Sequence, residues 1–201
     1  MFVEQKFNIP PLKGISQKNI EEHLKLYAGY VKNANSILEK IPDYSQWAEK
    51  DPFVPYFVGE LHRRFSFEYN GMRNHEVYFA SLEGGSHPIA KDSPLYSAIE
   101  RSFGSFDGWL AAFKKSAATI RGIGWMVLWY DKKSGSLLSS WVDEQHYGQL
   151  NGATMILGLD MWEHAYVADY QPSGKKNYVE DFFNNFNWTV IERNYANASA
   201  I

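Results

Sequence analysis

The nine residues 158–166 decide the fold, and they read Gly158-Leu159-Asp160-Met161-Trp162-Glu163-His164-Ala165-Tyr166. An apolar run rich in strand-forming residues, 154–159, leads into Asp160, and His164 follows four residues later. If a helix begins near Asp160, its carboxylate and the imidazole of His164 lie one turn apart on the same side. A carboxylate and an imidazole so placed can share one metal ion. The alternative is a helix N-cap at Asp160 followed by an ordinary core histidine.

The composition of the 201-residue chain is that of a globular protein, with 45% apolar residues, 21% charged residues and a formal net charge of −3. This length suffices for one well-buried domain or two small ones. Because no basic cluster is present, nucleic acid is not expected as the main partner. No stretch approaches the roughly 18–20 apolar residues of a membrane span, and the first residues lack the apolar core of a signal peptide. We therefore expect a cytoplasmic protein that does not cross a membrane.

The absence of cysteine restricts the chemistry further. It excludes disulfides, thiolate metal ligands and thiol nucleophiles together. Any metal must therefore be bound by nitrogen and oxygen atoms.

The first part of the chain has the pattern of two long helices. Ser16 is a candidate N-cap for a helix from about residue 17 to 40, which we expect to end at Ile41-Pro42. A polar connector, residues 42–55, leads to a second helix over about residues 56–82. The Gly84-Gly85-Ser86 sequence then indicates a boundary. Residues 1–85 are therefore predicted to form an antiparallel helical hairpin domain.

The second part, residues 86–201, mixes helical and strand patterns. Short amphipathic helices are expected at 94–103 and 105–119, and further helices at 161–168 and 175–195. Strand patterns lie at 125–131, 137–142 and 154–159, with a turn at 132–135 between the first two. The predicted class is α+β: a helical hairpin followed by a mixed domain with a small three-stranded antiparallel sheet flanked by helices.

The stretch 158–166 resembles the D-x-W-E-H-A-Y signature of the iron/manganese superoxide dismutases. The resemblance extends over nearly the whole chain, through the segment 7–12, the turn Gly122-Ile123-Gly124-Trp125 and the Asn187-Trp188 pair. It implies the two-domain fold of that family, with a metal between the domains. The function it implies is disproportionation of superoxide to dioxygen and hydrogen peroxide by one-electron cycling of a single manganese or iron ion.

The resemblance also implies the ligands, because His23 and the Asn74-His75 pair match the family's other two ligand positions. The expected set is thus His23, His75, Asp160 and His164. Three imidazoles and one carboxylate suit iron, manganese or zinc. Considered singly, His23 and His75 could equally be core histidines. The other three histidines are interpreted as surface or structural: His62, His87 and His146.

Further positions match residues that surround the family's metal. Gln145 matches the glutamine that hydrogen-bonds the metal-bound solvent, and the combination of Gly71 with Gln145 is more usual in manganese forms, which favours manganese. Trp125 and Trp162 match the indoles that wall the site, although plain core packing would also explain them. A hydrogen bond from the Gln145 amide to the metal-bound solvent would tune how readily the metal is reduced.

The first helix departs from the family pattern, in which a histidine follows the ligand after four residues and a tyrosine after eight. Here Tyr27 follows His23 after four and Tyr30 after seven. In a regular α-helix both spacings return to the starting face, whereas eight residues require a π-bulge. We therefore expect a regular helix in which Tyr30 takes the gateway position and Tyr27 replaces the relay histidine.

Two more features concern the surroundings of the site. In the family the equivalent of Glu163 reaches the equivalent of His164 in the partner subunit, which implies a homodimer, alone or paired into a tetramer. Tyr166 and Trp162 are expected, with Glu163, among the residues at the dimer contact or around the ligands. The family's entrance arginine has no clean match, and Lys175 or Lys176 stands nearest to attract superoxide.

Two other functions remain open at this point. A protein with the dismutase fold could serve a structural or assembly role with weak or no activity, although such a protein would be expected to lose ligands. A non-haem iron oxygenase using two histidines and one carboxylate is disfavoured, because its chemistry needs several open coordination positions and a fourth protein ligand removes one.

Overall fold

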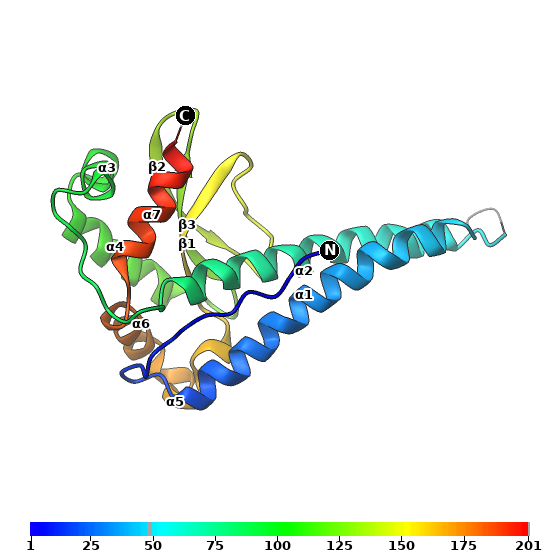
Figure 1. Ribbon diagram of the computed structural model, residues 1–201, viewed down its shortest axis with the longest axis horizontal. Coiled ribbons are helices and arrows are strands. Elements are labelled where there is room, and N and C mark those ends of the chain that lie inside the picture. Colours follow the sequence, from blue (N-terminus) through cyan, green and yellow to red (C-terminus); the bar gives the residue numbers. More distant parts are fainter. Residues whose placement is uncertain (48–49, 201) are drawn as a thin grey trace.

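The computed structural model describes residues 1–47 and 50–200. Two long antiparallel helices, α1 (Gln17–Ser45) and α2 (Val54–Ala80), lie side by side and project beyond the rest of the molecule (Figure 1). The N-terminal segment runs along this hairpin as an extended chain. Ser16 caps α1, because its hydroxyl accepts the backbone N–H of Asn19 at 3.1 Å. The predicted N-terminal hairpin is confirmed.

The first helix is longer than predicted, because Pro42 lies inside it rather than after its end. Proline removes one backbone hydrogen bond, and in the last turn the loss is confined to a single carbonyl. Side chains also bind carbonyls there: the Ser45 hydroxyl donates to Ile41 O at 2.7 Å and the Gln46 amide to Pro42 O at 3.4 Å. Of the predicted connector 42–55, residues 48 and 49 lie outside the described residues.

Two short helices, α3 (Pro94–Phe103) and α4 (Phe106–Thr119), precede the sheet, each capped by a serine side chain. The sheet consists of β1 (Trp125–Asp131), β2 (Ser136–Val142) and β3 (Ala153–Asp160), in the order β2-β1-β3, with both pairings antiparallel. The middle strand β1 is almost entirely buried. The predicted three-stranded antiparallel sheet and the α+β class are therefore confirmed.

The register of the sheet brings one end of each strand to the same place. Trp125, the first residue of β1, pairs with Val142 at the end of β2 and with Asp160 at the end of β3. Helix α2 packs against β3, and α1 packs against the turn that follows it. The start of β1, the ends of β2 and β3, and the inner faces of both long helices therefore meet at one point.

The C-terminal region is more broken than predicted. Instead of single helices at 161–168 and 175–195, it forms five short elements: η1 (Glu163–Ala165), α5 (Val167–Tyr170), η2 (Pro172–Gly174), α6 (Lys175–Asn184) and α7 (Trp188–Ser199). Asparagines cause the second break. The Asn187 side chain caps α7 by accepting Thr189 N–H at 3.1 Å, while Asn185 binds the backbone of Lys13.

Within residues 1–47 and 50–200, none of the helices combines the length and the apolar character needed to cross a membrane.

Candidate metal centre

Asp160 is the last residue of β3, so the predicted helix beginning at this residue is wrong. Its Oδ1 atom instead accepts the backbone N–H of Trp162 at 2.8 Å, which reverses the chain into the single 3-10 turn η1. His164 lies in that turn. The four-residue spacing still brings the two side chains together, with Asp160 Oδ2 and His164 Nε2 3.1 Å apart. The prediction that Asp160 and His164 lie close together is therefore confirmed, but the helix predicted to bring them together is replaced by a strand end and a 3-10 turn.

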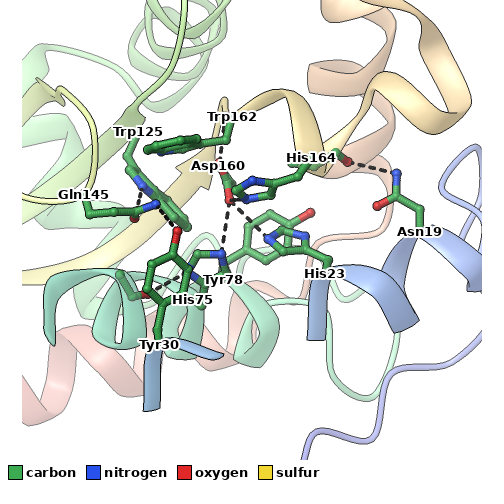
Figure 2. Close-up of polar contacts among 12 residues, drawn as sticks. Asn19, His23, Tyr30, His75, Tyr78, Trp125, Gln145, Asp160, Trp162 and His164 are labelled. Atoms are coloured by element: carbon green, nitrogen blue, oxygen red, sulfur yellow. Dashed lines mark hydrogen bonds and ion pairs between the residues drawn. The ribbon is translucent and has the colours of Figure 1, made fainter. Parts of the chain in front are cut away.

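Four side chains converge on one point between the hairpin and the sheet (Figure 2): His23 from α1, His75 from α2, Asp160 from β3 and His164 from η1. Asp160 Oδ2 lies 3.2 Å from His23 Nε2 and 3.6 Å from His75 Nε2. One potential ligand atom from each residue lies within 4.8 Å of all the others. Ligand atoms bound at about 2.1 Å to a common ion lie within roughly 4 Å of one another, so the widest separation, 4.8 Å, needs to shrink by about 0.8 Å.

The hydrogen-bonding state of His75 fits a metal. His75 Nδ1 lies 2.6 Å from Gly71 O, where it donates its proton, and this leaves a lone pair on Nε2. His75 Nε2 is fully buried, and it has no hydrogen-bond partner among residues 1–47 and 50–200. An unpaired buried polar atom costs about 1–3 kcal/mol. An ion bound by this nitrogen would remove that penalty, so the residues present fit a metal.

The protonation states also favour cation binding. Burial lowers the pKa of His75 to about 3, and repulsion from His23 acts in the same direction. Burial likewise lowers the pKa of His23, although Asp160 opposes this. Burial would raise the pKa of Asp160, but the charge and hydrogen bond of His164 and the hydrogen bond of His23 hold it well below its usual range. Near neutral pH the cluster thus offers neutral imidazoles at His23 and His75 and one carboxylate.

Beside the cluster, a hydrogen-bonded chain links three other predicted site residues (Figure 2). The Trp125 indole N–H donates to Gln145 Oε1 at 2.9 Å, and Gln145 Nε2 donates to the Tyr30 hydroxyl, also at 2.9 Å. Gln145 is fully buried, so both ends of its amide are fixed. The Tyr30 ring lies 5.1 Å from that of His75, and burial raises the pKa of Tyr30 well above its ordinary value. The neutral phenol therefore persists at physiological pH.

The remaining predicted site residues are Trp162, Glu163 and Tyr166, and they lie in different surroundings. Trp162 stacks on His164 with ring centroids 5.6 Å apart, and its indole N–H donates to Glu144 O at 3.1 Å. Glu163 is exposed in η1, while Tyr166 is buried against Tyr178. Trp162 thus forms a wall of the cluster, and Glu163 faces outward from it.

Sequence reasoning missed several residues that support the cluster. The Tyr178 hydroxyl donates to the backbone oxygen of Asp160 at 2.8 Å, and Tyr78 lies against His23 with ring centroids 5.0 Å apart. The Asn19 amide holds the end of η1 through Ala165 O at 3.2 Å. Helical spacing could have indicated two of these residues, because Asn19 precedes His23 by four residues and Tyr78 follows His75 by three. No comparable local signal identifies Tyr178.

Comparisons with known proteins identify the family of this chain. Residues 91–194 match the model of the iron/manganese superoxide dismutases, C-terminal domain. The chain is 34% identical over 186 residues to a superoxide dismutase [Mn] from Mycobacterium intracellulare, covering 92% of this chain and 86% of that protein. It is 36% identical to a superoxide dismutase [Fe] from Cupriavidus metallidurans, covering 93% and 91%, and 31% identical to a superoxide dismutase [Mn/Fe] from Aeropyrum pernix, covering 94% and 90%. The chain belongs to the iron/manganese superoxide dismutase family. It is an enzyme of that type, dependent on a manganese or iron ion, and a purely structural or assembly role is not favoured.

The first helix is regular, as its sequence predicted. From Gln17 to Ser45 it is α-helical throughout and contains no π-bulge. The seven-residue spacing therefore places His23 and Tyr30 on the same face of the helix. Tyr27 turns away from the Gln145–Tyr30 hydrogen bond: its hydroxyl accepts Gln5 N–H at 2.9 Å and donates to Glu76 at 3.3 Å. Burial raises the pKa of Tyr27 to about 12. The structure thus brings Tyr30, but not Tyr27, into the hydrogen-bonded surroundings of the cluster.

Proposed function

We propose that His23, His75, Asp160 and His164 hold the metal with which this enzyme disproportionates superoxide. The proposal rests above all on the convergence of these four side chains around the buried Nε2 of His75, which has no hydrogen-bond partner in the described part of the chain. When bound, manganese or iron supplies one-electron redox chemistry by alternating between its trivalent and divalent states. Overall, two superoxide anions and two protons yield one dioxygen and one hydrogen peroxide.

The residues of the chain orient the ligands, exclude water and supply a proton. Asp160 provides the one negative charge among the four ligands, and Gly71 O fixes the His75 tautomer. The aromatic wall of Trp125 and Trp162 excludes bulk water. The Tyr30 hydroxyl, kept protonated by its raised pKa and bound to Gln145, holds a proton where a reduced oxygen species needs one.

We further propose that manganese is the working metal. The support is the combination of a glycine at position 71 with a glutamine at position 145, together with the fixed orientation of the Gln145 amide between Trp125 and Tyr30. Nitrogen and oxygen donors alone do not distinguish manganese from iron, so the surrounding hydrogen bonds must set the preference.

Reconstitution of the metal-free protein tests both proposals. Separate samples are loaded with manganese or iron, their metal content is measured by elemental analysis, and superoxide turnover is expressed per bound ion. We expect about one ion per chain in both samples and at least about tenfold higher turnover with manganese, the scale of effect that residues around a metal typically exert. Equal or higher turnover with iron would contradict the manganese proposal, and loading without any turnover would contradict the assigned site.

We also propose that the enzyme works as a homodimer joined near His164. The His164 side chain is 21% exposed, and within the described residues its Nδ1 atom has no hydrogen-bond partner. A ligating histidine normally donates its second ring N–H to a carboxylate or carbonyl. The exposed Glu163, one residue away, is suited to supply that carboxylate to the other subunit.

The dimer proposal predicts that Glu163→Ala shifts the protein toward monomers, because each subunit loses the partner carboxylate at the shared contact. Light scattering coupled to size exclusion at micromolar concentration measures the mass. Glu100→Ala, which removes an exposed acid on α3, is the matched control and should remain dimeric. A wild-type monomer, or a Glu163→Ala dimer as stable as wild type, would contradict the proposal.

A further inference from the structure

Phe67 closes the outer side of the candidate site. It lies on α2 eight residues before His75, and its half-buried ring lies beside residues from three separate parts of the chain. The ring centroids lie 6.0 Å from Tyr30, 6.3 Å from Trp162 and 5.7 Å from His146. Tyr30 and Trp162 in turn border the cluster through Gln145 and His164. A small anion that approaches the cluster past Tyr30 and Trp162 must therefore pass Phe67.

Among the residues that the structure describes, one cation, that of Arg64, lies over this ring. The guanidinium carbon of Arg64 lies 4.1 Å from the Phe67 ring centroid, a distance typical of a cation–π contact. Arg64 Nε also donates to Glu68 Oε1 at 2.8 Å. The Glu68 side chain is 3% exposed, whereas that of Arg64 is 50% exposed. The pair therefore presents its positive end to solvent and keeps its negative end inside.

This fixed position distinguishes Arg64 from ordinary surface cations. Two contacts hold the guanidinium, one with the aromatic face and one with a buried carboxylate that needs a counter-charge. A long, exposed side chain without such contacts would average its charge over many rotamers.

The lysines suggested by the sequence are less well placed for this role. Lys175 is half-buried and donates to Ile120 O at 2.7 Å, and burial lowers its pKa. Lys176 lines a groove between α4 and α6, with Leu110 and Val179 among the other lining residues. Neither lysine contacts Phe67 or Tyr30 among the interactions found in residues 1–47 and 50–200.

We propose that Arg64 is the electrostatic guide that draws superoxide over Phe67 toward Tyr30 and the four candidate ligands. The inference rests on the proposed function, since it concerns entry to that same site. A positive charge at the rim of a narrow, low-dielectric approach raises the local concentration of a small anion and speeds its association. This effect weakens as salt screens the charge.

The experiment compares four variants after metal loading, each with its metal content determined. Arg64→Gln removes the charge, Arg64→Lys retains it, and Arg63→Gln removes a neighbouring exposed charge that binds Glu60 instead. Because Arg64→Gln leaves Glu68 buried without its cation, the double variant Arg64→Gln/Glu68→Gln is included to restore stability. Thermal unfolding identifies any variant that has lost its fold.

At low ionic strength, we expect Arg64→Gln and the double variant to lower kcat/KM by about threefold to tenfold, and to flatten its decline with added salt. Arg64→Lys should retain most of the wild-type value, and Arg63→Gln should match wild type. Azide serves as a second probe, because it is a small monoanion. Its dissociation constant, measured by isothermal titration of the metal-loaded protein, should rise severalfold in Arg64→Gln but not in Arg63→Gln.

Several results would overturn the assignment of Arg64. These are a salt dependence of Arg64→Gln equal to that of wild type, an unchanged azide affinity, or equal effects of Arg63→Gln and Arg64→Gln. If the metal-loaded wild type has no turnover, the proposed function fails. The azide measurement then still decides whether Arg64 attracts anions to the cluster.

Discussion

Replacing His164 with alanine is expected to strip the protein of its metal and abolish dismutation while leaving the fold in place. His164 Nε2 lies 3.1 Å from Asp160 Oδ2, so the change removes one of the four converging donors. The loss should exceed the roughly 10–100-fold that removal of an outer hydrogen-bonding partner of a metal ligand costs. Elemental analysis should find well below one ion per chain, with turnover at background.

The fold should survive because of where His164 lies. Its side chain is 21% exposed in a short turn, so alanine leaves a solvent-accessible gap rather than a sealed cavity. Circular dichroism and thermal unfolding of the metal-free protein should therefore resemble wild type. His62→Ala, which removes an exposed histidine on α2, is the control and should keep both metal and activity. Full metal content and normal turnover in His164→Ala would rule out the ligand assignment.

Sequence periodicity accounts for most of the fold. The stripe containing Ile20, His23 and Tyr27 becomes the buried face of α1, and the alternating and apolar runs become the strands β1 to β3. The period of the apolar residues indicates which face of a segment packs against the core, and it differs between helices and strands. Elements with long, regular patterns were therefore predictable from the chain alone.

Local spacing was less informative at the site, because different backbones satisfy it. Asp160 and His164 lie close together because a 3-10 turn follows the end of a strand. A helix would also bring two side chains four residues apart close together. Pro42 is a second example: proline usually ends a helix, but near a C-terminus its cost is confined to one carbonyl.

Long-range pairings explain what the sequence could not predict. Trp125 meets Asp160 through the strand register, and Tyr178 reaches the Asp160 backbone from α6. Each contact depends on tertiary packing that no single segment encodes.

Substituting alanine for Gly71 is expected to destabilise the protein and displace Tyr30, although alanine normally strengthens a helix. A Cβ atom built at position 71 would lie 2.6 Å from Cδ1 and 2.7 Å from Cε1 of the Tyr30 ring. These are atoms of a rigid ring whose hydroxyl is bound to Gln145. Overpacking of this kind costs about 1–3 kcal/mol, and at about 2–4 °C per kcal/mol for a chain of this size the melting temperature should fall measurably.

The same change should lower turnover, because Tyr30 must leave the hydrogen bond that holds Gln145 Nε2. Gly59→Ala is the matched control: Gly59 lies on the same helix, and its added Cβ would meet nothing within 4 Å. That variant should gain about 0.5–1 kcal/mol, as expected when alanine replaces glycine in a helix interior. Chemical denaturation of both variants measures the difference directly.

A double-mutant cycle separates the steric conflict from any general effect at position 71. In the background of Tyr30→Ala the ring is absent, so Gly71→Ala should become neutral or stabilising, and the coupling energy should reach about 1–3 kcal/mol. If Gly71→Ala costs the same with and without the tyrosine ring, the two residues are not in conflict. The physical reason for glycine at position 71 is that any side chain there would clash with the Tyr30 ring. An uncoupled result would therefore remove that reason as well.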